Sequence, residues 1–150
     1  MKIIGNADDV RKYTLVASAA YSTVETKTFD TVPLMKAHQR MEALLVLTAA
    51  GTLVGDTLDV LLDFSPDDGT TWINAAHFTQ ILGNGADSLT FAAVFDTASP
   101  GTSILALATD LTAGNVRPAV CGTAVRVRHT IANGGGTHSF TYSLVLYGLD

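Results

Sequence analysis

Apolar and β-branched residues recur along this chain in short alternating runs, and turn residues separate the runs. Over 57–65, large apolar side chains occupy alternate positions, while Asp59 and Asp63 lie on the opposite face. Such alternation is typical of half-buried β-strands. The pattern predicts strands near 12–19, 23–32, 42–49, 57–65, 71–81, 88–95, 102–109, 116–121, 123–131 and 138–147. We therefore expect an all-β protein, an antiparallel β-sandwich of jelly-roll type with at most one short helix.

The pattern also predicts how the chain is organised. Residues 1–11 are polar and lack a period, which indicates an N-terminal arm. Residues 12–150 then form a single β-sandwich domain, in keeping with the length of the chain. The segment 33–41 allows two interpretations. Its apolar residues fall at helical spacing behind Pro33, so it forms either one short helix or a connection between two strands.

The last two predicted strands are joined by the Gly-rich segment 132–137, which indicates a β-hairpin. In the expected register, Val127 lies opposite Tyr142. This register places the large apolar side chains of both strands on one face and Arg126 and Arg128 on the other.

A turn motif joins two predicted strands in the middle of the chain. It reads S-x-D-x-G-x-T-W from Ser65 to Trp72, with Asp67 and Gly69 at its centre. An Asp side chain can bond backbone amides in such a turn, and Gly accepts a positive φ. The letters match the Asp box of sialidases, where the box is a scaffold element. We interpret Ser65, Asp67, Gly69 and Trp72 as a structural hairpin motif, with Trp72 as its core anchor. A calcium loop would need further oxygen ligands, which the sequence does not supply.

The composition indicates a protein with extensive contacts. Hydrophobic residues make up 47% of the chain and charged residues 15%, whereas globular chains carry about 25% charged residues. A soluble monomer depends on surface charge for its solubility. We therefore expect a homo-oligomer or a bound partner to cover much of the surface. A surface of Thr, Ser, Asn and Gly is the alternative explanation.

The charges are unevenly distributed. No Lys or Arg occurs between Arg40 and Arg117, a stretch that is rich in acids, and the net charge is −5. A basic stripe for a phosphate backbone is therefore missing, and we expect no nucleic-acid partner. The candidate interface residues are Arg126, Arg128, Asp59 and Asp63, on the outer faces of their strands.

The sequence shows no signature of catalysis, cofactor binding or metal binding. His129 and His138 make an incomplete metal site, and we interpret them as histidines at the rim of the core. Cys121 has no base nearby in the sequence, so we interpret it as a buried structural thiol. The apolar run 43–47 is far shorter than the roughly 20 residues that cross a bilayer. We expect no membrane partner, no secretion signal and folding in a reducing cytoplasm.

Two parts of the sequence resemble small β-sandwich structural proteins of tailed bacteriophages. The resemblance covers roughly 43–148 and is carried by the turn motif with Ala76–Ile81, and by the ending Val125–Ile131, Ser139–Leu144 and Tyr147-Gly148. It implies a non-enzymatic capsid decoration (cement) protein, or a neck or tail component, located in the virion and made in the host cytoplasm. The implied partners are the major capsid protein or another virion protein and further copies of the chain, with a trimer favoured.

A function of another class also fits the sequence. In a glycan-binding module, receptor-binding or carbohydrate-binding, Trp72, Tyr142 or Tyr147 would serve as a stacking platform for sugar rings.

Overall fold

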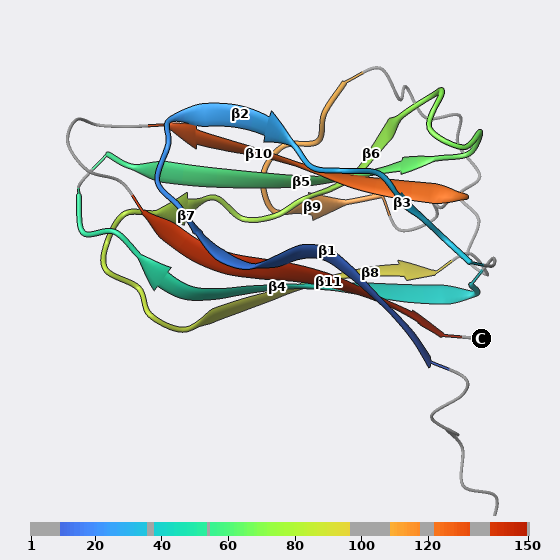
Figure 1. Ribbon diagram of the computed structural model, residues 1–150, viewed down its shortest axis with the longest axis horizontal. Coiled ribbons are helices and arrows are strands. Elements are labelled where there is room, and N and C mark those ends of the chain that lie inside the picture. Colours follow the sequence, from blue (N-terminus) through green and yellow to red (C-terminus); the bar gives the residue numbers. More distant parts are fainter. Residues whose placement is uncertain are drawn as a thin grey trace, which may run out of the picture.

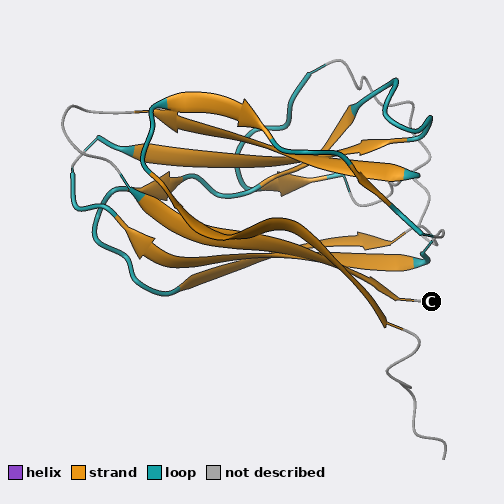
Figure 2. Cartoon of the chain, viewed as in Figure 1, coloured by secondary structure: helices purple, strands orange, loops and turns teal. Residues whose placement is uncertain are grey.

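The computed structural model describes residues 10–35, 38–53, 55–96, 109–117, 122–132 and 139–149. Within these ranges the chain forms strands and loops and no helix (Figure 2). The strands are β1 (Val10–Tyr21), β2 (Glu25–Thr28), β3 (Val32–Pro33), β4 (Arg40–Ala50), β5 (Thr57–Ser65), β6 (Ile73–His77), β7 (Ile81–Leu82), β8 (Leu89–Asp96), β9 (Asn115–Val116), β10 (Ala124–Ala132) and β11 (Phe140–Leu149).

The strands form two layers that pack face to face (Figure 1). The four-stranded sheet has the order β1-β11-β4-β8. The larger sheet has the order β2-β10-β5-β6-β9, with β3 paired to β10 and β7 to β5. All the pairs are antiparallel. The long strands mostly alternate between the two layers along the chain, which is the connectivity of a double-sheet jelly roll. The predicted antiparallel β-sandwich is confirmed.

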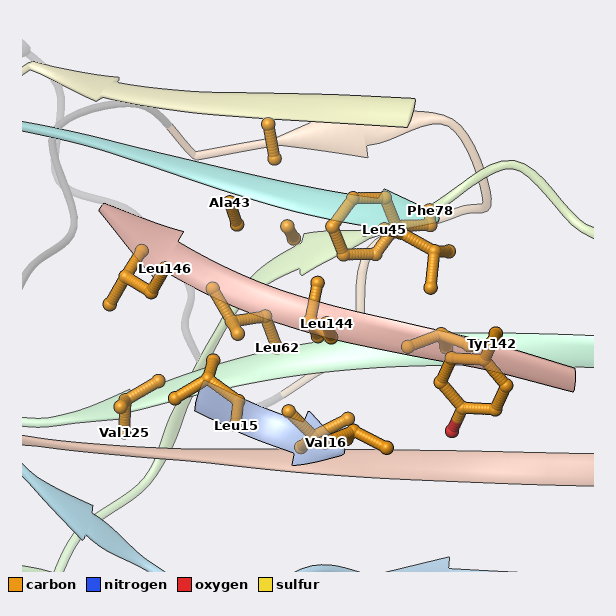
Figure 3. Close-up of a cluster of buried hydrophobic side chains, with 14 of the residues drawn as sticks. Leu15, Val16, Ala43, Leu45, Leu62, Phe78, Val125, Tyr142, Leu144 and Leu146 are labelled. Carbon is orange, nitrogen blue, oxygen red and sulfur yellow. The ribbon is translucent and has the colours of Figure 1, made fainter. Parts of the chain in front are cut away.

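The alternation in the sequence explains which side chains fill the space between the layers. On β4 and β11 every second side chain is buried, among them Leu45 and Leu144, while the residues between them face outward. Figure 3 shows this cluster, with side chains from both sheets meeting between the layers. Each large apolar side chain that is fully buried contributes roughly 1.5–3 kcal/mol relative to the exposed state. Burial of these two inner faces therefore drives the pairing of the layers.

The predicted C-terminal hairpin is wrong, although its faces were assigned correctly. β10 pairs with β5, β2 and β3, whereas β11 pairs with β1 and β4, so the two strands lie in opposite sheets. Val127 and Tyr142 are buried on inner faces, and Arg126 and Arg128 lie on an outer face. The physical reason is burial: in opposite layers, the apolar faces of both strands cover each other.

Other expectations about the elements have mixed outcomes. The segment 33–41 had two interpretations, a helix or a connection between strands, and its described part is a connection. Pro33 pairs with Ala124, and Leu34 N–H donates to Thr123 O at 2.8 Å. The predicted strand 102–109 lies outside the described residues except for Thr109, which is not in a strand. The expected arm 1–11 lies outside them up to residue 9, and β1 begins at Val10.

Candidate functional site

Three charged residues on the outer face of the larger sheet, Asp63, Arg126 and Arg128, meet in one network. Arg126 stands opposite Asp63 in the β10–β5 register, and its Nε donates to Asp63 Oδ2 at 3.0 Å. Arg128 donates from Nε to Oδ2 at 2.6 Å and from Nη2 to Oδ1 at 2.8 Å. Asn74 Nδ2 adds a hydrogen bond to Oδ1 at 3.1 Å. Asp63 is therefore buried, with 1% of its surface exposed, although it lies on an outer face.

This environment holds Asp63 in its charged form. Burial by itself would raise the pKa of the Asp63 carboxyl, but the hydrogen bonds from Arg128, Asn74 and Arg126 outweigh it and lower the pKa. The hydrogen bonds of Arg128 with Asp63, together with those to Asp110, raise the pKa of Arg128. Charge-assisted hydrogen bonds of this kind are about twice as strong as neutral ones.

The network also fastens the segment 109–117 onto the sheet. Arg128 donates from Nη1 and Nη2 to the two carboxylate oxygens of Asp110 at 3.0 and 2.8 Å. These hydrogen bonds lower the pKa of Asp110. Leu111 N–H donates to Asn74 Oδ1 at 2.9 Å. Arg128 therefore links strand β10 to the segment 109–117, whose position on the sheet the sequence pattern did not predict.

Asp59 belongs to a separate group nearby. His77 Nε2 lies 3.1 Å from Asp59 Oδ1, and His77 Nδ1 lies 2.7 Å from Leu111 O. Gln80 Nε2 donates to Asp59 Oδ2 at 2.8 Å. The structure thus brings Arg126, Arg128 and Asp63 together within one chain and leaves Asp59 beside His77. A contact of these four residues with another chain stays a prediction.

Trp72 does not belong to the core, so the prediction of a core anchor is wrong. Its side chain is half-buried, and its ring lies against the guanidinium of Arg126, with Cζ 4.3 Å from the ring centroid. Trp72 precedes Asn74 by two positions and therefore shares the outer face with it. Its position directly before β6, not its hydrophobicity, decides which way this side chain points.

The turn before Trp72 is built by its own side chains. Gly69 N–H donates to Ser65 Oγ at 2.7 Å, Ser65 Oγ–H donates to Asp67 Oδ1 at 2.9 Å, and Thr71 N–H donates to Asp67 Oδ1 at 2.6 Å. Asp68 and Gly69 adopt positive φ values of 54° and 97°. Since these hydrogen bonds join Asp67 to the turn itself, the motif organises the backbone between β5 and β6.

A buried polar cluster between the sheets was missed at the sequence level. His129 is fully buried, not at the rim as predicted, while His138 lies outside the described residues. His129 Nδ1 lies 2.8 Å from Tyr142 Oη, and Nε2 lies 3.3 Å from Glu25 Oε1. Because a carboxylate only accepts, Nε2 carries the proton and the Tyr142 hydroxyl donates to Nδ1. The alternation of His129 with Val127 and Ile131 was the signal that could have revealed it.

The cluster makes stability depend on pH. Burial lowers the pKa of His129, and the hydrogen bond with Glu25 offsets this only in part. Lys27 on β2 adds a positive charge nearby, while Tyr21 and Tyr142 contribute neutral rings. A His with a lowered native pKa contributes its full stability above its unfolded pKa of about 6.5 and loses it as the pH falls through the native value.

We therefore expect the urea midpoint of the wild type to fall between pH 7.5 and pH 5. His129→Gln should be less stable at pH 7.5 but should lose less stability over the same interval. Urea titrations of both proteins at several pH values test this. An equal pH dependence of the two proteins would show that His129 does not titrate in this range.

The structure also contains a small pocket at one open edge of the sandwich. It has a volume of about 100 Å³ and is lined by β6, β8 and β9 residues that include Ala76, Phe91 and Val116. Sites for small ligands typically measure about 300–1,000 Å³. The pocket is thus too small for a substrate of that size.

The described ranges contain no candidate metal site. No group of three or more His, Cys, Asp or Glu side chains is arranged to hold a metal ion there. Cys121 lies outside those ranges. Among the described residues, no helix has the length and apolar character needed to span a membrane.

Comparisons with known proteins identify a fold and no family. No family model and no curated protein matches the chain. Among solved structures, the VP2 subviral particle of infectious bursal disease virus matches with a TM-score of 0.56 and 15% identity, over 95% of this chain and 33% of that one. T=1 particles derived from the same virus match with a TM-score of 0.56 and 14% identity, over 93% and 31%. The Gx strain matches with a TM-score of 0.53 and 15% identity, over 92% and 31%. The chain spans about a third of the length of these viral proteins, with which it shares the fold.

Proposed function

We propose that this protein is a non-enzymatic virion structural protein, a capsid decoration (cement) protein that binds the outer surface of a phage major capsid lattice. The observation that carries the proposal is the fold. The sandwich matches, over 95% of this chain, the VP2 subviral particle of infectious bursal disease virus. The resemblance of the sequence to phage structural proteins points to the same class.

The distribution of charge supports this role. Charged residues make up only 15% of the chain, and several of them are used within it, as the Asp63 network shows. A rigid sandwich with few free charges can cover large areas of other subunits at a low desolvation cost. Many weak contacts on a lattice act together through multivalency, and a closed homo-oligomer, such as the expected trimer, increases their number.

The polar groups of the described residues favour a structural role over catalysis. Asp63, His77 and His129 each have hydrogen-bond partners on both sides, and each links two or more strands or segments. A catalytic acid or base must instead have its reacting atom open to a substrate. These groups stabilise the sandwich.

Immunogold electron microscopy of purified virions tests the proposal directly. An antibody against this protein should label intact particles over the outer surface of the capsid. Label confined to the neck or tail would replace decoration with the neighbouring structural role. Virions that contain no copy of the protein by mass spectrometry would overturn the proposal.

One observation keeps a glycan-binding module as the second candidate. Trp72 lies at the surface, where one face of its ring is covered by Arg126, and Tyr147 is half-buried on an outer face. Tyr142 is fully buried and hydrogen-bonded, so it cannot serve as the stacking platform that the sequence allowed.

A further inference from the structure

The outer face of the four-stranded sheet differs from that of the larger sheet. Its middle carries small and apolar side chains on all four strands, and we call this surface the apolar sheet face. Its residues are Thr14, Leu44, Val46, Thr90, Ala92, Val94, Ser143, Val145 and Tyr147. The charged residues of this face, Lys12, Arg40, Glu42 and Asp96, are gathered at one end.

No other described element covers the apolar sheet face. The contacts of its strands with the other layer, β1 with β10 and β8 with β9, lie on the inner side, and Figure 1 shows no described strand beyond this sheet. The larger sheet by contrast satisfies its outer charges within the chain, through Asp63, Arg126 and Arg128. Ion pairs within the chain thus satisfy the charges on the outer face of the larger sheet. The apolar sheet face, by contrast, packs against no other part of the described chain.

The register of the charged residues points to a copy of the same chain. Lys12, Tyr147 and Glu42 form one row across β1, β11 and β4. A two-fold axis along β11 lays β1 of each copy over β4 of the other. Lys12 then meets Glu42 of the partner subunit, the same pair forms a second time by symmetry, and Val145 meets its own equivalent. This is the self-complementarity that an isologous interface requires, and two sheets that pack face to face keep their strands aligned within about 30°.

We propose that the apolar sheet face binds the same face of a second copy, with Lys12 and Glu42 forming reciprocal ion pairs. The inference deepens the proposed function and rests on it for its place in the virion, since it names the surface through which the protein self-associates. A two-fold contact either makes a dimer or joins two trimers. In both cases the oligomer contains an even number of copies.

The test uses the purified full chain and size-exclusion chromatography with light scattering at micromolar concentration. The wild type should elute as an oligomer with an even number of copies. In Lys12→Glu, both symmetry-related ion pairs become pairs of acids. In Glu42→Lys, both become pairs of lysines. Because like charges across an interface oppose association, each variant should weaken association at least ten-fold. The double variant Lys12→Glu/Glu42→Lys should restore it.

Arg11→Glu is the matched control. It makes the same change of charge one residue away, on the opposite side of β1, and Arg11 is exposed. It should associate like the wild type, and circular dichroism should show the same fold for all variants. A monomeric or odd-numbered wild type would overturn the inference, as would a double variant that stays dissociated or single variants that match Arg11→Glu. None of these outcomes changes the immunogold result, so the two proposals can fail separately.

Discussion

Arg128→Ala should lower the free energy of unfolding by about 3–5 kcal/mol, the cost of removing one partner from a buried ion pair. Asp63 is 1% exposed and would lose two of its charge-assisted hydrogen bonds. The substitution also removes the hydrogen bonds from Arg128 to Asp110, which hold the segment 109–117 against the sheet. Arg126 and Asn74 remain near Asp63 and keep the loss from being larger.

Urea denaturation of Arg128→Ala, Asp63→Asn and the double variant measures this coupling. The double variant should be less destabilised than the sum of the single variants, because it removes the Asp63 carboxylate together with the Arg128 guanidinium that stabilises it. Arg11→Ala, on an exposed side chain, should change stability by less than about 0.5 kcal/mol. Additive effects of the two substitutions would show that Asp63 and Arg128 do not stabilise each other.

The pH dependence of the same variants has a defined sign. In the wild type, the lowered pKa of Asp63 means that its contribution to stability is complete above the unfolded value of about 4 and is lost as the pH falls through the native value. Without Arg128, fewer hydrogen bonds oppose the effect of burial, so the pKa of Asp63 should be higher in the variant than in the wild type. Acid then neutralises the stranded carboxylate, so the deficit of Arg128→Ala should shrink as the pH is lowered from 7 toward 4.

Phe64→Ala should cost about 3–5 kcal/mol, whereas Trp72→Ala, although it removes a larger side chain, should cost only about 1–2 kcal/mol. Phe64 is fully buried and packs edge-to-face on Phe95, with ring centroids 5.1 Å apart. Its removal leaves a cavity between the sheets. Trp72 lies at the surface, so its removal takes away a cation–π contact with Arg126 and part of an apolar cover.

Thermal and urea unfolding of the two variants test this order. An equal or larger loss for Trp72→Ala would contradict the placement of Trp72 on the outer face. The same variant separates the two candidate functions, since it should keep its fold. Sugar binding by the wild type on a glycan array that disappears in folded Trp72→Ala would favour the glycan-binding module over the virion role.

The sequence determined by itself the features that depend on neighbours in the chain. Because side chains alternate along a strand, the polarity of Val127, Arg128 and Tyr142 was enough to predict which of them point toward a core. The all-β fold class follows from repetition of that local rule.

Only the tertiary structure decided which segments meet, because pairing depends on burial summed over the whole chain. β10 and β11 follow each other in sequence yet lie in opposite sheets, where their apolar faces cover each other. The same packing brings Arg128 to Asp63 and Asp110 and encloses His129 beside Tyr142 and Glu25. The charge and hydrophobicity of a side chain determine what kind of partner stabilises it. The arrangement of the two layers determines which residue is that partner.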